Sequence, residues 1–391
     1  SNNTAMGSNA LKENTTGAGN VAIGALALDA NTTGSSNTAV GENSLGANTT
    51  GSNNAAFGEG SLLKNTTASD NVAVGDACMV ENTTGENNVA VGRLALNANT
   101  TASNNTAVGV NSLKTNTTGA LNVAVGKDAL HFNTTGDDCT AIGLDALYAN
   151  TTAHDNTAVG SRALDACTTG ATNTSVGRSS MTTCTTGASN TVMGASAGFG
   201  ITTGSSNVAI GHDAMTTVTT GVNNICIGAT SNTQVAGSEN NIVIGVGISG
   251  GENSQFRFGK ASNTVSNEFD TDAAWTRASD IRKKRNIKDD TLGLEFINDL
   301  STKTFQWKPS NEFPKEWDDY NEENKMNLDA VMHGLIAQDV KSALDKQGVD
   351  TFGGWIEGKD GMQNVSREMF VTPLIKAVQE LSTQVDELKQ E

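Results

Sequence analysis

The densest group of reactive side chains lies between Ser279 and Ile287, where the chain reads Ser-Asp-Ile-Arg-Lys-Lys-Arg-Asn-Ile. A serine hydroxyl is a weak nucleophile that needs a neighbouring general base. Lysine can serve as that base only in its neutral form. Taken alone, however, this stretch is typical of a solvated, charged loop, so its chemistry depends on the segments around it.

Several motifs follow this stretch in a fixed order. They are Leu292–Ile297, Phe305–Trp307, His333–Val340 and a helix predicted over residues 373–391. In this order they resemble the C-terminal intramolecular chaperone domain of phage endosialidases, tail fibres and tailspikes, a self-cleaving serine peptidase domain. The resemblance covers residues 279–391 and implies a small α+β domain.

The resemblance also implies roles for individual residues. Ser279 would be the nucleophile, Lys284 its general base, and the bond between Ala278 and Ser279 the one that is cut. The reference pKa of lysine, near 10.4, would have to fall for this purpose. The neighbouring cations act in that direction and burial would help, whereas Asp280 opposes it unless it pairs with Arg282.

Three further residues lie in the matching motifs. Asn286 and Gln338 would support the site, and His333 would either assist catalysis or only pack. The chain is therefore expected to act once, on itself, as an endopeptidase with a Ser-Lys dyad. The oxyanion donors cannot be identified from the sequence.

The C-terminal helix carries apolar residues at alternating intervals of four and three, the pattern of a heptad seam. Pro373 suits the first turn of this helix. The helix could pack on its own domain or form a short coiled coil among three chains, and the resemblance favours the coiled coil. The seam comprises Leu374, Val378, Leu381, Val385 and Leu388.

Residues 1–249 are a repeat with a period of 17. A glycine closes each copy without insertion or deletion, and such a fixed period predicts a stacked solenoid, here of fifteen coils. The glycines are Gly7, Gly24, Gly41, Gly58, Gly75, Gly92, Gly109, Gly126, Gly143, Gly160, Gly177, Gly194, Gly211, Gly228 and Gly245.

Each copy contains a segment such as Asn37-Thr38-Ala39-Val40-Gly41, in which a small residue lies between two larger ones. This alternation predicts a short β-strand with a bulky face and a small face. An Asn-Thr-Thr segment follows later in the copy and predicts a second β-segment closed by a turn. The expected fold is mostly β: a parallel β-roll of 17-residue coils, each with two short strands.

One column of asparagines is expected to point inward, because the same position later becomes Cys167, Cys184 and Ile201. Stacked amides can hydrogen-bond along such a column, although solvated turn asparagines are the alternative. The ladder comprises Asn31, Asn48, Asn65, Asn82, Asn99, Asn116, Asn133 and Asn150.

A roll this thin buries little apolar surface by itself. The small alanine face of the strand therefore suggests the close approach of another chain. The Asn-Thr-Ala-Val-Gly pentapeptide resembles the β-roll heads of trimeric autotransporter adhesins and similar repeats of phage tail fibres, which implies a parallel homotrimer. Residues 250–278 would form the transition to the C-terminal domain.

The composition excludes several classes of binding partner. The net charge of −17 disfavours nucleic acid and anionic membranes. No stretch of 18 apolar residues is present, so no membrane insertion is expected.

The histidines lack metal-ligand spacing, and no metal or other cofactor is expected. The five cysteines fit buried free thiols better than a disulfide framework, although Cys167 and Cys184 share a column.

Together these features predict a bacteriophage tail fibre whose C-terminal domain aligns three chains and then cleaves itself. The fibre would belong to the virion, be assembled in the host cytoplasm, join the tail through a missing N-terminal part, and bind a glycan or protein receptor on the host surface. A bacterial trimeric surface adhesin is the alternative. A glycan-degrading tailspike is disfavoured, because acids such as Asp137 and Asp145 are scattered over outward turns. No turnover enzyme is expected in the repeats.

Overall fold

The computed structural model describes residues 2–251, 253–261, 263–268, 281, 284–315, 317, 320–324, 326–358 and 361–390. The chain divides into two compact units, Ser1–Ala278 and Ser279–Glu391. We describe each unit by itself.

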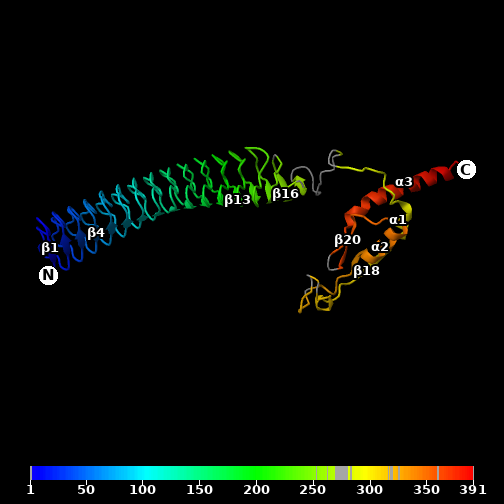
Figure 1. The fold of residues 1–391 in the computed structure, drawn as a ribbon, viewed down its shortest axis with the longest axis horizontal. Helices are drawn as coiled ribbons and strands as arrows, with labels where there is room; N and C mark the ends of the chain where they lie inside the picture. Colours follow the sequence, from blue (N-terminus) through cyan, green and yellow to red (C-terminus); the bar gives the residue numbers. More distant parts are fainter. Residues whose placement is uncertain are drawn as a thin grey trace. The chain divides into compact units, whose positions relative to one another are not determined.

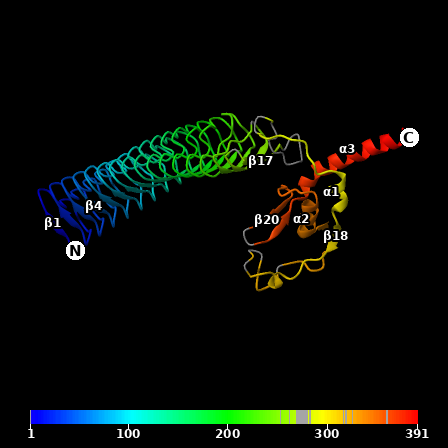
Figure 2. The same cartoon turned by 45° about the vertical axis from the view of Figure 1, so that its right-hand side comes forward.

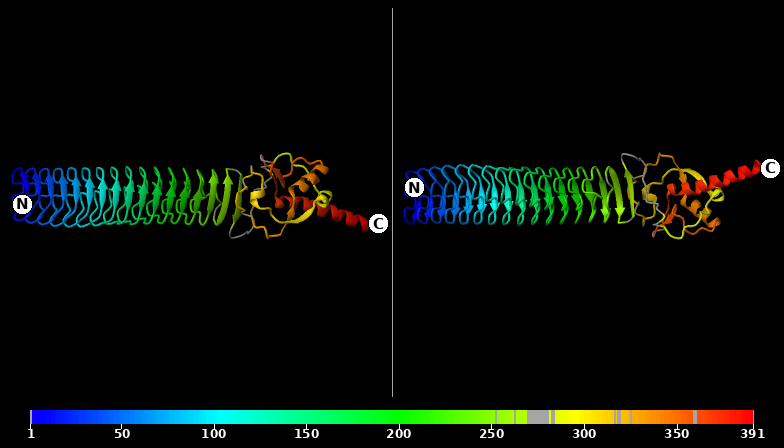
Figure 3. Two further views of the ribbon diagram at one scale, coloured as in Figure 1. Left: turned by 90° about the horizontal axis from the view of Figure 1, so that it is seen from below. Right: turned by 90° about the horizontal axis from the view of Figure 1, so that it is seen from above.

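The first unit is a β-solenoid of stacked coils (Figure 1). From β1 to β14, each coil contributes one three-residue strand, which pairs in parallel with the strand 17 residues later, as Thr106 does with Val123. Among the described residues, seventeen strands form this sheet. The predicted mostly-β solenoid of 17-residue coils is thus confirmed. Figure 3 shows the strands lying one behind another along the unit.

The strands of the repeats are β1 Thr4–Met6, β2 Val21–Ile23, β3 Thr38–Val40, β4 Ala55–Phe57, β5 Val72–Val74, β6 Val89–Val91, β7 Thr106–Val108, β8 Val123–Val125, β9 Thr140–Ile142, β10 Thr157–Val159, β11 Thr174–Val176, β12 Thr191–Met193, β13 Val208–Ile210, β14 Ile225–Ile227 and β15 Ile242–Val246. Two longer strands, β16 Gln255–Lys260 and β17 Asn263–Glu268, end the sheet as an antiparallel pair.

The second β-segment predicted for each coil is wrong. In the Asn-Thr-Thr segment, the amides of Thr117 and Thr118 both donate to the carbonyl of Thr134, at 3.0 and 3.2 Å. The Thr117 hydroxyl donates to the same oxygen at 2.9 Å. Three donors that share one acceptor bend the chain, whereas a β-ladder needs one acceptor for each donor. The coils therefore stack here through bends.

The predicted use of the alanine face is also wrong. The central residue of the strand, such as Ala107 or Ala124, points into its own coil and is fully buried there. The coil interior also holds Leu113 and its equivalents, so the strand centre takes compact residues, alanine in most coils and Val192, Cys226 or Val243 in others. The bulky strand residues point outward, and Phe57 and Met193 are 41% and 49% exposed. We call this outward row of strand-end residues, from Met6 to Ile244, the apolar column.

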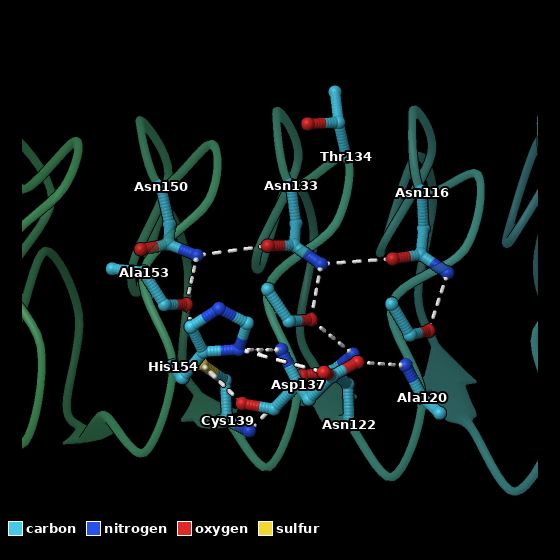
Figure 4. A network of polar contacts seen from close by, with 12 residues as sticks. Asn116, Ala120, Asn122, Asn133, Thr134, Asp137, Cys139, Asn150, Ala153 and His154 are labelled. Carbon is cyan, nitrogen blue, oxygen red and sulfur yellow. Dashed lines mark hydrogen bonds and ion pairs between the residues drawn. The ribbon is translucent and has the colours of Figure 1, made fainter.

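The expected amide ladder is present in the structure (Figure 4). Asn133 Nδ2 donates to Asn116 Oδ1 at 2.8 Å and to the carbonyl of Gly136 at 2.9 Å. Asn150 Nδ2 continues the column to Asn133 Oδ1 at 2.8 Å. The ladder ends there, because the next residue is Cys167, and Asn150 Oδ1 has no partner within the described residues. Buried amides are thus paired between coils, as burial requires.

The repeated glycine is dictated by stacking. Gly109 has φ +137°, a conformation that L side chains rarely adopt, and a Cβ atom there would lie 2.4 Å from the carbonyl oxygen of Gly126. The same close approach recurs from coil to coil, so the spacing of 17 residues cannot drift.

The five cysteines lie inside the coils as free thiols. Burial raises the pKa of Cys78 and Cys226 to about 12 and that of Cys139 to about 11. A hydrogen bond to Cys184, together with burial, raises the pKa of Cys167. Cys78, Cys139, Cys167 and Cys226 are therefore neutral packing groups at ordinary pH, whereas the hydrogen bond with Cys167 lowers the pKa of Cys184.

The second unit is a small α+β fold (Figure 2). Its helices are α1 Leu294–Asp299, α2 Ala337–Lys346 and α3 Val371–Leu388, with short 3-10 turns η2 Ser310–Glu312 and η3 Arg367–Phe370. Its strands pair as two antiparallel ribbons, β18 Thr302–Phe305 with β19 Met332–Leu335, and β20 Trp355–Glu357 with β21 Gln363–Val365.

Aromatic rings form the core of this unit. Phe296 is fully buried and stacks on Phe370, with ring centroids 6.2 Å apart. Phe352 meets both rings edge to face. The Glu380 carboxylate accepts the backbone N–H of Leu294 at 2.7 Å, which joins the start of α1 to α3.

Among the described residues, none of the helices combines the length and the apolar character that crossing a membrane requires.

We predict that Gly109→Ala lowers the free energy of unfolding by at least about 3 kcal/mol, because it combines strain with a backbone clash. Gly60→Ala is the matched control: Gly60 also has positive φ, at +62°, but open space surrounds its Cβ position. Denaturant unfolding of both full-length variants measures the difference. Equal losses would contradict the stacking argument.

We also predict that stability falls as pH rises from about 9 towards 12. The folded state keeps the thiols of Cys78 and Cys226 protonated above the ordinary thiol pKa of 9.0. The unfolded state therefore loses its thiol protons at lower pH, and rising pH favours unfolding. Each such thiol contributes at most about 1.4 kcal/mol per pH unit. Cys78→Ser, which introduces the residue found at Ser61 and Ser112 in the same column, should flatten this fall in unfolding experiments between pH 8 and 11. An unchanged slope would contradict the assignment.

Candidate functional site

The proposed catalytic group lies partly outside the described residues. Ala278, Ser279, Asp280 and Arg282 all fall in that part of the chain. Lys284 is described and its side chain is exposed, while its backbone N–H donates to the carbonyl of Ile281 at 3.0 Å. The second unit alone therefore does not bury Lys284, as a lysine base would require.

The remaining predicted residues lie on different elements. Asn286 is exposed and has φ +53°. Gln338 is exposed in the first turn of α2, where its carbonyl accepts a hydrogen bond from the Ser342 hydroxyl at 3.1 Å. His333 is exposed on β19, opposite Thr304 of β18.

His333 lines a groove of about 740 Å³ within the second unit. The β18–β19 ribbon forms one wall, and Ile297, Leu300 and Phe370 supply apolar surface. Arg367 reaches close to the backbone of Gly334, where a Cβ atom would lie 3.0 Å from its Nη2. Of these residues, only Ile297, His333 and Gly334 lie in the sequence motifs. The motifs give no sign of a groove, because the two strands of its wall are separated by 26 residues.

Helix α3 has two distinct faces. Pro373 and Ala377 are buried against its own unit, and Glu380 on the same side binds α1. The predicted seam lies on an adjacent face, where Val378 is 65% and Leu381 48% exposed and Leu374 lines the groove. Leu374, Val385 and Leu388 are exposed as well. The first turns of α3 therefore pack on their own unit, whereas the seam residues stay largely exposed to further contacts.

No group of three or more His, Cys, Asp or Glu side chains in the described part of the chain is placed to hold a metal ion.

Residues 279–349 match the family described as chaperone of endosialidase. No curated protein matches the chain. No solved structure matches it either. The matched segment begins at Ser279, where the second compact unit also begins. This match and the β-solenoid of 17-residue coils together fit a protein of the tail fibre or tailspike type.

Proposed function

We propose that this chain forms a trimeric bacteriophage tail fibre for host attachment. Its second unit would bring three chains into register and then separate from the roll by self-cleavage before Ser279. The fibre would be assembled in the host cytoplasm and carried on the virion.

The observation that carries the proposal is the apolar column. Residues such as Val108, Ile142 and Ile210 line the outside of the roll, coil after coil, while alanine fills the inside. A continuous apolar row of this length favours contact with another surface. A parallel copy offers the same row at the same spacing, so three identical chains can bury it together.

Identical coils create a register problem. If one chain slips by 17 residues, Val108 still meets a valine or an isoleucine, so the wrong pairing is almost as stable as the right one. Such misaligned assemblies are kinetic traps. A separate unit that trimerises first would solve the problem, and the exposed seam of α3 supplies a surface for this step.

Self-cleavage would follow assembly. The Ser279 hydroxyl would attack the carbonyl carbon of Ala278 while its proton passes to a neutral Lys284 amine. The Ser279 nitrogen would leave with a proton, giving an ester between Ala278 and Ser279, and water would hydrolyse this ester to a carboxylic acid and a free serine. Because Lys284 is exposed in the single chain, the burial that favours its neutral form has to come from partner chains. Cleavage would then occur only in correctly assembled chains, and it would make their assembly irreversible.

We predict that freshly expressed wild-type chain gives two fragments by mass spectrometry under denaturing conditions. Ser279→Ala should remain intact because the nucleophile is gone, and Lys284→Met should remain intact because the base is gone. Lys308→Met is the matched control and should cleave normally, since Lys308 is an exposed lysine of the same unit that lies outside the basic stretch. Cleavage of the Ser279→Ala chain at the same bond would contradict the assignment.

We further predict that Leu381→Asp reduces both the trimer fraction and the extent of cleavage, because it places a charge in the seam. Thr383→Asp adds the same charge at an exposed position outside the seam and should change neither. Light scattering and denaturing gels measure the two quantities. Full cleavage of a monomeric Leu381→Asp chain would separate cleavage from assembly and refute the coupling.

A further inference from the structure

Three rings gather on two neighbouring coils of the roll: His131, Phe132 and Tyr148, which we call the aromatic platform. The Phe132 ring lies 4.6 Å from the ring of His131 and 5.0 Å from that of Tyr148, centroid to centroid. The His131 and Tyr148 rings are 5.3 Å apart. The Phe132 side chain is 41% exposed, so the platform offers an apolar ring surface to the outside.

The three rings are not part of the repeat pattern of the coil. One coil earlier, the positions of His131 and Phe132 hold Lys114 and Thr115, and one coil later the position of Phe132 holds Ala149. The inner leucines beside the platform, Leu130 and Leu147, are fully buried, as their equivalents are in other coils. The platform is therefore an addition to a coil that is already complete, and such additions to a repeat are where binding function is expected.

Charged groups surround the rings. Asp128 accepts a hydrogen bond from Asn111 Nδ2 at 2.9 Å and pairs with His131 Nδ1 at 3.1 Å and Lys127 Nζ at 2.6 Å. Although burial opposes it, hydrogen bonding to Lys127, Asn111 and His131 lowers the pKa of Asp128. The side chain of His131 is only 12% exposed, so this network holds its ring in place within the platform.

The rim of the platform offers both donors and acceptors. Asp145 and Arg162 pair at 3.9 Å, and their side chains are 28% and 62% exposed. Lys127 is exposed to the same degree as Arg162. Lys114 and Asp165 lie in the column of His131 and Tyr148, one coil before and one coil after them, so three cations balance three carboxylates around the platform although the whole chain carries −17.

We infer that the aromatic platform binds a neutral pyranose saccharide. The apolar C–H face of the sugar would lie on Phe132, whose ring Tyr148 meets edge to face and supports, and its hydroxyls would bond to Asp145 and Arg162. The acidic roll disfavours anionic sugars and nucleic acids at the same surface. Three parallel copies of a weak site would strengthen attachment through multivalency, and only this last step rests on the proposed trimer.

The test uses the full chain on immobilised neutral homopolymers of glucose, galactose, mannose and N-acetylglucosamine, with polysialic acid as the anionic comparison. At least one neutral polymer should bind. Phe132→Ala should weaken binding at least about tenfold, because the stacking ring is lost, and Tyr148→Ala should do the same, because the ring that supports Phe132 is lost. Tyr148→Phe should retain binding. Phe199→Ala is the matched control and should bind like wild type: Phe199 lies three coils beyond Tyr148 in the same column and is 49% exposed.

Three results would overturn the inference: binding to no neutral polymer, preference for polysialic acid, or binding that survives both alanine substitutions. Loss of trimer in the Phe132→Ala chain would identify the platform as a contact between copies. The cleavage and mass of each variant are measured in parallel, so the two proposals can fail separately. An intact monomer that binds sugar through Phe132 would refute only the proposed function, and a cleaved trimer that binds none would refute only the platform.

Discussion

Each coil of this protein must repeat the backbone path of the coil before it, 17 residues away. The constraint is set where glycine meets glycine: the carbonyl oxygen of Gly126 occupies the space that a side chain on Gly109 would fill. The asparagine ladder adds a second fixed spacing inside the coil, because each amide needs the next one as a partner. Thin coils with small interiors become a long regular unit only because these contacts repeat without error.

The same regularity explains why a second unit is needed. Stacking within a chain fixes the spacing of the coils but gives no information about which coil of a neighbouring chain should lie alongside. The apolar column is nearly uniform along the roll, so in the proposed trimer it would supply affinity between copies without supplying register. The second unit carries a single exposed seam, which in the same proposal would pair with its copies in one register. In the proposed trimer, the roll would hold the chains together and the second unit would set their register.

Much of this fold follows from the sequence, and the failures have physical causes. The period of 17, the strand at Asn37–Gly41 and the inward asparagines could be predicted, because each depends on a repeated position. The direction of the strand faces could not. Alternation predicts two faces without saying which is inside, and the narrow coil interior selects Ala107 over the larger Val108. The Asn-Thr-Thr bend was missed because its threonine hydroxyls bond to the next coil, which β-propensity does not register. At the candidate site, the motifs located Lys284 and His333 but could not show how far each is exposed, since exposure depends on how the surrounding elements pack.

The central claim is that the second unit drives assembly of the roll, and refolding tests it most directly. The mass in solution is measured by light scattering after dilution from denaturant, for the uncleaved Ser279→Ala chain and for a chain that ends at Ala278. The account predicts that the uncleaved chain returns to three times its monomer mass, whereas the shorter chain returns as monomer or as aggregate of undefined size. Recovery of the same trimer by both chains would contradict the account, because the roll would then align itself.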